Sequence, residues 1–146
     1  VPVIRCFIGG FDVPEPFGHQ LLLDCYHCEG KALENIDACH ALLLDVVDVL
    51  GVHMQSPPFV FRTDGVQFPD KAGLSGWVPL VESGIQIHTL IPQRFVSLDV
   101  YSCYAIDETA VLAQVKHWLD YTDVDSQVIL RGTKYHAQEA LSCPPS

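Results

Sequence analysis

The segment LVESGIQIHTL, residues 80 to 90, places a serine, a glycine and a histidine inside an otherwise apolar run. The Ser83 hydroxyl can attack the carbonyl of Glu82 and form an ester, provided that the turn is strained and nearby groups hold the tetrahedral intermediate. Gly84 offers backbone freedom for such a turn. The imidazole of His88 can then remove the serine α-proton, so that β-elimination breaks the ester. These steps would cut the chain between residues 82 and 83 and leave a pyruvoyl group at the new amino terminus.

The same residues also have an ordinary structural interpretation. A Ser-Gly pair between two strands is typical of a hairpin turn. A single histidine in a strand is usually a packed or solvated residue. Spacing alone therefore leaves both self-cleavage and a plain hairpin open.

The elements that must position these residues follow from hydrophobic periodicity. Residues 1–17 contain three prolines and are expected to form an extended lead-in to a single domain over residues 18–146. Helical spacing predicts a helix over residues 32–50 that Gly51 ends, and a second that begins after an Asp107 cap and runs to about residue 120. Apolar runs predict strands at residues 19–28, 59–62, 75–82, 85–90, 95–103 and 126–132.

This order of elements predicts an α+β fold, a two-layer sandwich in which an antiparallel sheet carries helices on one face. Pro79 requires its strand to have an edge or a bulge at that point. The pattern Asp-x-Tyr-x-Cys occurs at residues 24–28 and again at residues 99–103. An internal β-α-β duplication is one explanation of this repeat, and coincidence is the other.

Composition narrows the classes of function. The chain has 146 residues and is 49% hydrophobic, which is typical of one folded domain. Its formal charge of -10 argues against a nucleic-acid partner. No apolar run predicts a membrane span, and the first ten residues lack the pattern of a signal peptide. Six cysteines without a visible secretion signal favour reduced thiols in a cytoplasmic protein.

The pair Cys25-x-x-Cys28, followed by Cys39 and His40, has the residue types of a zinc site. However, residues 20–28 have the pattern of a strand, and Cys39 and His40 fall in a helical pattern. The elements therefore favour cysteines that pack in the core, and no metal site is predicted.

Four motifs in the second half of the chain occur in a fixed order, and together they resemble one known family. They are Ser75-Gly76, Glu82-Ser83, His88-Thr89 and Asp99-Val100-Tyr101-Ser102-Cys103. This arrangement resembles the prokaryotic-type S-adenosylmethionine decarboxylases, which are pyruvoyl enzymes. The segment GHQLLLDCYHC, residues 18–28, is also similar to the first strand of that family. With the following helices, the resemblance covers most of the chain beyond residue 17.

The resemblance implies a role for each matching residue. Ser83 would become the pyruvoyl cofactor, Glu82 the carboxyl end of the first fragment, and His88 the base for elimination. Ser75 would help to hold the intermediate, and Cys103 would donate a proton during decarboxylation. The resemblance also implies that Glu82 and His88 contact the substrate, whose amine forms a Schiff base with the pyruvoyl carbonyl. Finally, it implies a homodimer in which two sheets face each other.

Some residues depart from the family pattern. Gly84 stands where the family usually has histidine, and Leu90 and Gln93 stand where it commonly has the tryptophan and glutamate of Trp-Pro-Glu. Adenine favours an aromatic face and ribose hydroxyls favour a carboxylate. The resemblance therefore does not extend to residues expected around a nucleoside.

Four hypotheses for the function follow. The first is a pyruvoyl-dependent decarboxylase of S-adenosylmethionine for spermidine and polyamine synthesis. The second is the same chemistry on another amino acid, such as arginine or ornithine. The third is an unprocessed, non-catalytic homologue. The fourth is a thiol hydrolase that uses Cys103 and His88.

Overall fold

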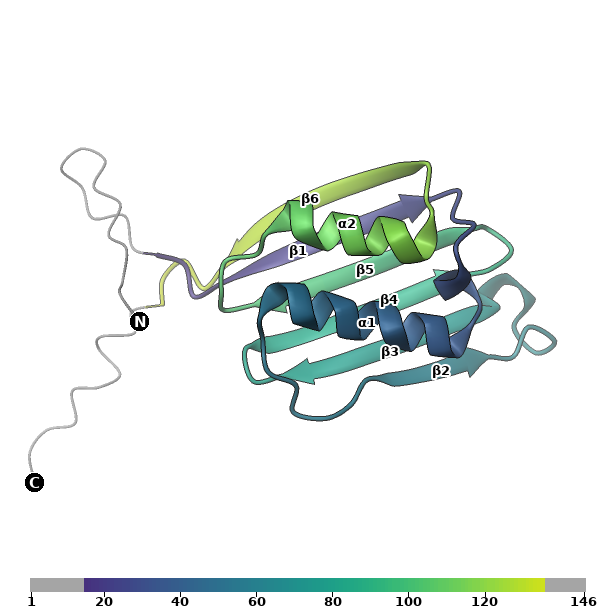
Figure 1. Ribbon diagram of the computed structural model, residues 1–146, viewed down its shortest axis with the longest axis horizontal. Helices are drawn as coiled ribbons and strands as arrows, with labels where there is room; N and C mark the ends of the chain where they lie inside the picture. The colour runs from purple at the N-terminus through teal and green to yellow at the C-terminus, as the bar shows by residue number, and fades with distance from the viewer. Residues whose placement is uncertain (1–14, 136–146) are drawn as a thin grey trace, which may run out of the picture.

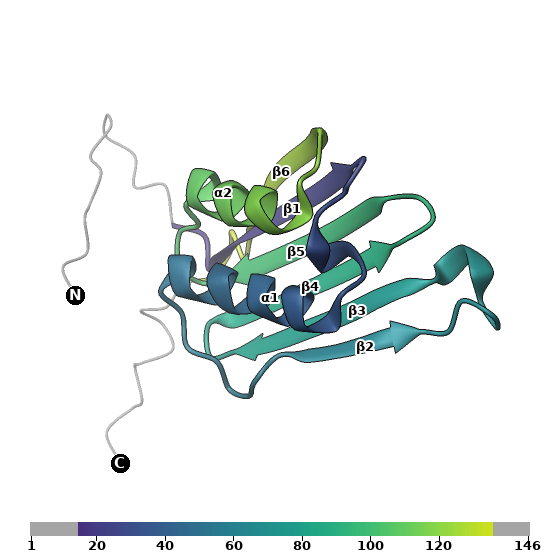
Figure 2. The same ribbon diagram turned by 45° about the vertical axis from the view of Figure 1, so that its right-hand side comes forward.

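The computed structural model describes residues 15–135. One six-stranded sheet carries two helices on a single face (Figures 1 and 2). This arrangement confirms the predicted α+β sandwich. The strands are β1 (Gly18–Tyr26), β2 (Phe59–Thr63), β3 (Gly73–Leu80), β4 (Ser83–Leu90), β5 (Phe95–Ser102) and β6 (Asp123–Arg131). The helices are α1 (Ile36–Leu50) and α2 (Glu108–Leu119), with short 3-10 helices at Lys31–Leu33 and Pro69–Lys71. Most of the predicted lead-in, together with Cys6 and Cys143, lies outside the described residues.

The strand order in the sheet is β2-β3-β4-β5-β1-β6, and every neighbouring pair is antiparallel. The first strand of the chain therefore lies between β5 and β6. Two connections carry the helices, since α1 links β1 to the edge strand β2 and α2 links β5 to β6 (Figure 1). The first connection crosses most of the sheet, whereas the second passes over β1 alone. The internal duplication is therefore not confirmed.

Alternation along the strands builds the core between the sheet and the helices. In β5, Val96, Leu98 and Val100 are fully buried, while the residues between them are only half-buried. The helices contribute residues at helical spacing to the same core, among them Leu42, Leu43, Val46, Val111, Val115 and Leu119.

Helix boundaries depend on caps. α1 begins later than expected because the Asn35 side chain accepts a 2.8 Å hydrogen bond from the Ala38 amide. Gly51, with a φ of 63°, ends α1 as predicted. Asp107 caps α2 through the Ala110 amide at 3.0 Å, also as predicted. Within residues 15–135, no helix is long and apolar enough to cross a membrane.

Pro79 lies in an interior strand, yet it breaks no ladder. β2 pairs with β3 only as far as Trp77, and beyond that point the Pro79 carbonyl accepts a 2.9 Å hydrogen bond from the Gln55 amide. The nitrogen and oxygen of one strand residue point to the same side. The ring nitrogen of Pro79 therefore points away from β4, and the residue occupies a local edge, as expected.

The cysteines near the zinc-like motif are core residues. Cys25, Cys28 and Cys39 are fully buried, and the four cysteines that the structure describes are free. Burial raises the pKa of the Cys25 thiol to about 12, and that of the Cys28 and Cys39 thiols to about 11. These thiols are therefore protonated at neutral pH, as packed core thiols are expected to be.

The sheet face opposite α1 and α2 is called the open face below, since no described element covers it (Figure 2). Aromatic side chains line the part of it that β2 and β3 form. Phe61 is 65% exposed and Trp77 is 54% exposed, and both stack on Phe59, with ring centroids 6.5 and 6.0 Å away. Large apolar side chains thus face outward beside the expected site residues.

Candidate active site

Ser83 is the first residue of β4 and follows a tight turn of Val81 and Glu82 that joins β3 to β4. Its φ is 144°, a value that residues other than glycine rarely adopt. Such a backbone costs about 1–3 kcal/mol and persists where the surrounding structure enforces it. The strain that the sequence led us to expect is therefore present, but it lies at Ser83 itself. The expectation that Gly84 supplies the conformational freedom is wrong, because its φ is not positive.

The carbonyl that Ser83 would attack has a hydrogen-bond donor. The amide of Cys103, just after β5, donates to the Glu82 carbonyl oxygen at 2.9 Å. Ser83 pairs with Ser102 across β4 and β5, and this register brings the end of β5 against the turn. A fixed amide at this position stabilises negative charge on the attacked oxygen. Sequence reasoning selected Cys103 for its thiol and missed this contribution of its backbone.

The Glu82 carboxylate points inward and is bound by one residue. It is 4% exposed, and it accepts hydrogen bonds from the His53 amide at 2.9 Å and from His53 Nδ1 at 2.6 Å. These hydrogen bonds, the backbone one first, hold the pKa of Glu82 below its ordinary value. The substrate-binding role expected for Glu82 stays a prediction. Sequence reasoning missed His53, because a single histidine after a helix carries no recognisable pattern.

Ser75 and His88 form a second group on the open face. They are directly paired across β3 and β4, and Ser75 Oγ lies 3.1 Å from His88 Nδ1. Asp99 lies on the neighbouring strand, where its pKa is raised by burial and by the charge of Asp24, and is lowered in part by His88. The sheet thus brings together residues from two of the motifs, Ser75-Gly76 and His88-Thr89. The roles expected of Ser75 and His88 stay predictions.

The two groups are far apart within one copy of the chain. His88 is five residues beyond Ser83 on an extended strand, which corresponds to about 16 Å along β4. The structure therefore brings Glu82, Ser83 and Cys103 together, and separately Ser75 and His88. A thiol hydrolase would need Cys103 beside His88, and one copy does not provide that contact.

His19 in β1 is in cross-strand register with Ser83. It pairs with Ser102, which in turn pairs with Ser83, and its Nδ1 is buried without a hydrogen-bond partner in the described part of the chain. Gly18 allows β1 to approach, because a Cβ there would lie 2.8 Å from the Ser102 carbonyl oxygen. The Gly-His start of the first strand was part of the sequence resemblance, and it was the available signal for these two residues.

The residues that depart from the family pattern lie at the far end of β4. Leu90 is its last residue and pairs with Phe95. Gln93 lies in the turn to β5, where its side-chain Nε2 donates to the Asp70 carbonyl at 3.3 Å. Leu90 is seven residues from Ser83, so it lies about 23 Å away along the same strand.

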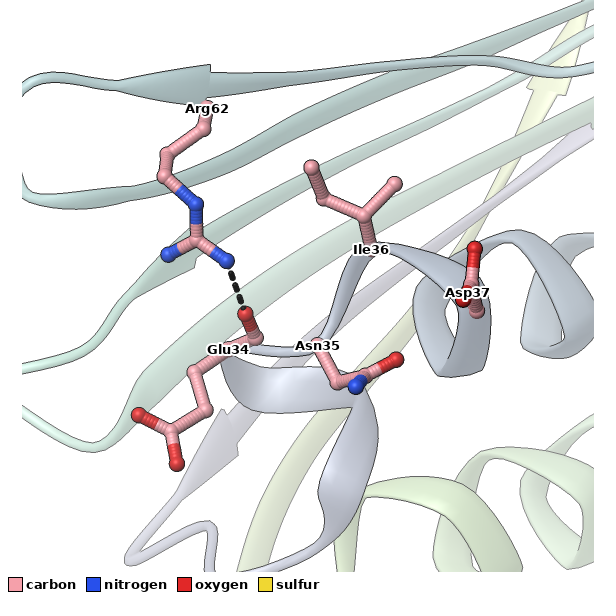
Figure 3. Close-up of a pocket in the computed structure, with 5 residues that line it drawn as sticks. All are labelled: Glu34, Asn35, Ile36, Asp37 and Arg62. Carbon is pink, nitrogen blue, oxygen red and sulfur yellow. Dashed lines mark hydrogen bonds between the residues drawn. The ribbon is translucent and has the colours of Figure 1, made fainter.

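A hollow of about 570 Å³ occurs elsewhere, beside the first turn of α1. Figure 3 shows Arg62 of β2 reaching across it to donate to the Glu34 carbonyl at 2.5 Å. None of the expected site residues lines this hollow. Within residues 15–135, no group of three or more histidine, cysteine or acidic side chains is arranged to hold a metal ion. The expected site residues near the β3–β4 turn therefore lie apart from this hollow.

Comparison with known proteins identifies the family of the chain. Residues 19–132 match the family described as S-adenosylmethionine decarboxylase. The S-adenosylmethionine decarboxylase proenzyme of Clostridium botulinum is 27% identical over 116 residues, which cover 79% of this chain and 94% of that protein. The proenzyme of Acidithiobacillus ferrooxidans is 29% identical over 86 residues, and this match spans only 59% of each protein.

A solved structure shows the same fold. The adenosylmethionine decarboxylase of Aquifex aeolicus superposes with a TM-score of 0.69 at 22% sequence identity, and the match covers 82% of this chain and 93% of that one. Because the family match includes most of the sequence, both helices and every strand from β2 to β6, the chain belongs to the S-adenosylmethionine decarboxylase family.

Proposed function

We propose that this chain cuts itself between Glu82 and Ser83 and then decarboxylates S-adenosylmethionine. The observation that carries the proposal is the strained φ of 144° at Ser83, directly after a carbonyl that the Cys103 amide binds at 2.9 Å. Strain at a reacting residue and a fixed donor at the attacked oxygen both favour acyl transfer. The related proteins named above are called proenzymes, which supports a processed chain.

The proposed cleavage uses the chain's own atoms and one water. Ser83 Oγ bonds to the Glu82 carbonyl carbon, the peptide C–N bond breaks, and the Ser83 nitrogen takes the hydroxyl proton. Removal of the Ser83 α-proton then breaks the bond between Cβ and Oγ, and Glu82 leaves as a carboxylate. Water replaces the nitrogen of the resulting dehydroalanine, which releases ammonia and leaves the pyruvoyl group.

The residues around Ser83 fit such a group. Ser83 is half-buried at the start of β4, and Cys103, also half-buried, follows β5, the strand with which Ser83 pairs. A pyruvoyl group supplies a carbonyl that withdraws electrons from a substrate amine while carbon dioxide leaves. The Cys103 thiol would hold the proton that replaces the carboxylate at the substrate α-carbon.

A homodimer is part of the proposal, because one copy does not hold a complete set of residues. Ser75 and His88 lie about 16 Å along the sheet from Ser83, on the open face. A second copy that packs its open face against the first would supply its own Ser75 and His88 to that serine. The exposed Phe61 and Trp77 on this face support a buried interface.

A second candidate substrate is another amino acid, such as arginine or ornithine. The observation that favours it is the chemistry of Leu90 and Gln93, which offer neither an aromatic ring nor a charge for a nucleoside. S-adenosylmethionine remains the first candidate because the family match covers both residues. The free thiols of the described cysteines support the expected cytoplasmic location.

The intact mass of the purified protein under denaturing conditions tests the proposal. We expect two fragments that meet at residues 82 and 83, with the second fragment lighter than an unmodified chain because ammonia has been lost. A Ser83→Ala variant should give one full-length mass. A full-length mass for the wild-type chain would overturn self-cleavage and favour the unprocessed, non-catalytic homologue.

A further inference from the structure

We infer that His53 is a positioning residue for the self-cleavage reaction, because it binds the Glu82 side chain and so holds the strained turn in place. The inference rests on the proposed self-cleavage and extends it to a residue outside the motifs that resemble the family. His53 touches neither Ser83 nor the attacked carbonyl, and it acts through Glu82.

His53 contacts both residues of the turn. Its amide and its Nδ1 bind the Glu82 carboxylate at 2.9 and 2.6 Å. Its carbonyl oxygen accepts a hydrogen bond from the Val81 amide at 2.9 Å. Three hydrogen bonds from one residue therefore fix the backbone of the turn on one side and its acidic side chain on the other.

The residues after His53 extend this attachment along β3. Met54 forms an isolated antiparallel bridge with Leu80, and the Gln55 amide donates to the Pro79 carbonyl at 2.9 Å. The segment 53–55 thus runs beside the end of β3 where β2 has stopped. Because Gly51 ends α1 just before it, the segment links the turn to the helix layer.

Burial makes the His53 side chain necessary for this arrangement. Glu82 is 4% exposed, whereas His53 is 73% exposed and covers the carboxylate from outside. A buried carboxylate that loses a donor is strongly disfavoured, and it regains hydrogen bonds most readily by turning toward water. Such a rotation of Glu82 would release the turn and let the φ of Ser83 relax.

The consequence for cleavage is geometric. On the opposite side of the turn, the Glu82 carbonyl oxygen lies on the Cys103 amide. The peptide bond to be cut is therefore held between the carboxylate contact with His53 and the carbonyl contact with Cys103. Misplacement by about 1 Å at a reacting centre slows a reaction up to about a hundred-fold, so loss of either contact should slow acyl transfer.

The test measures the rate at which newly synthesised full-length chain converts to the two fragments, by denaturing gel or intact mass. His53→Ala removes the imidazole donor but keeps the backbone contacts. His53→Asn keeps an N–H donor at the same number of bonds from the backbone as Nδ1. His117→Ala, at an exposed histidine of α2, is the matched control. We expect His53→Ala to slow cleavage by roughly ten- to a hundred-fold, and His53→Asn and His117→Ala to cleave near the wild-type rate.

A stability measurement separates positioning from a general structural role. In chains that carry Ser83→Ala and stay full-length, the melting temperature reports what His53→Ala does to the fold alone. We expect the chain with both Ser83→Ala and His53→Ala to be folded. We expect the chain with His53→Ala alone, which keeps Ser83, to cleave slowly. Glu82→Gln, which weakens the same contact from the other side, should slow cleavage as well, and adding His53→Ala to it should slow cleavage little further.

The outcomes distinguish the inference from the proposed function. Equal cleavage rates for wild type and His53→Ala would overturn the role of His53 and leave self-cleavage standing. Slow cleavage by His53→Asn as well as His53→Ala, with Glu82→Gln at the wild-type rate, would also overturn it. A wild-type chain that never cleaves would overturn both.

Discussion

The amide of Cys103 donates a 2.9 Å hydrogen bond to the carbonyl oxygen of Glu82, the residue that precedes Ser83. This oxygen would gain negative charge if Ser83 attacked, and in the proposed cleavage Cys103 would then contribute to the first step through its backbone. Its thiol is assigned to a later step, the protonation of the decarboxylated substrate. Side-chain substitutions keep the amide, and the two contributions can therefore be separated.

Cys103→Ala is expected to leave cleavage unchanged and to lower decarboxylation. The amide that binds the Glu82 carbonyl remains, while the proton donor is lost, and such donors contribute roughly a hundred- to ten-thousand-fold in rate. Intact mass measures cleavage, and release of carbon dioxide measures turnover. An unchanged turnover number would remove the thiol from the mechanism.

Ser83→Gly should be more stable than Ser83→Ala by about 1 kcal/mol, although neither variant can cleave. Glycine adopts a φ of 144° without strain, whereas alanine at this position keeps the strain. Urea unfolding of both full-length proteins gives the difference. Gln86, an exposed residue in the middle of β4, provides the matched control. There the order should reverse, with glycine less stable than alanine, and the same order at both positions would argue against strain at Ser83.

His88→Ala and Ser83→Ala chains are expected to complement each other when they are produced together. Neither should cleave alone, because one lacks the base and the other lacks the nucleophile. In a mixed dimer, the intact His88 of the Ser83→Ala chain can serve the Ser83 of its partner. Differently tagged chains and intact mass would show cleavage of the His88→Ala chain only. Two chains that stay full-length together would indicate that His88 does not act across a dimer.

The stability of uncleaved Ser83→Ala protein should fall in acid partly through Glu82. The folded-state pKa of Glu82 lies below its ordinary value of 4.5, chiefly because His53 donates hydrogen bonds to the carboxylate. Its contribution is therefore present above the unfolded-state pKa and is lost as pH falls through the lower folded-state pKa. Urea midpoints from about pH 7 to about pH 3 measure the loss. Adding Glu82→Gln should make the decline shallower, and an equally steep decline would contradict the assignment.

S-adenosylmethionine should bind more weakly than to a relative that keeps Trp-Pro-Glu. Leu90 lies about 23 Å from Ser83 in one copy, so Leu90 and Gln93 would contact a substrate bound at the Ser83 of the second copy in the proposed dimer. Lost stacking at Leu90 corresponds to roughly 0.5–1.5 kcal/mol, and a lost carboxylate at Gln93 to roughly 1.5–3 kcal/mol. Together these amount to about one to three powers of ten in Kd. Calorimetry of the wild type and of Leu90→Trp with Gln93→Glu should show tighter binding by the variant, and Gln127→Glu on β6 serves as a charge control.

The same titration with arginine and ornithine decides between substrates. Micromolar affinity of the wild type for S-adenosylmethionine alone would show that Leu90 and Gln93 do not weaken recognition. A preference for either amino acid would favour the second substrate. No heat from any of the three would favour the unprocessed homologue.

Local pattern was enough to predict much of the fold. The alternation of Val96, Leu98 and Val100 marks β5 as a strand with one buried face, and Asp107 marks the start of α2. The start of α1 was placed too early because Ala32 and Leu33 fit the helical pattern but belong to a separate 3-10 turn. Only the Asn35 cap distinguishes these two segments, and its effect depends on the backbone there.

The site could be predicted only in part, for a physical reason. Short motifs can be read directly from the sequence, and they contain Ser75, Glu82, Ser83, His88 and Cys103. The turn before Ser83 is bound by a distant segment, because His53, which contacts Glu82, lies 29 positions before it. Likewise, the strand register that places Ser75 beside His88 and Ser102 beside Ser83 is fixed by the sheet as a whole.

The order β2-β3-β4-β5-β1-β6 has a consequence for a chain cut between β3 and β4. The first fragment would keep β1, β2 and β3, and the second would keep β4, β5 and β6. β1 is hydrogen-bonded to β5 on one side and to β6 on the other, while β3 remains paired with β4. The strands of the two polypeptides would therefore be interleaved, and neither polypeptide would form a continuous half of the sheet. They could part only if the sheet itself unfolded, so the nicked protein would migrate as a single species in any native separation.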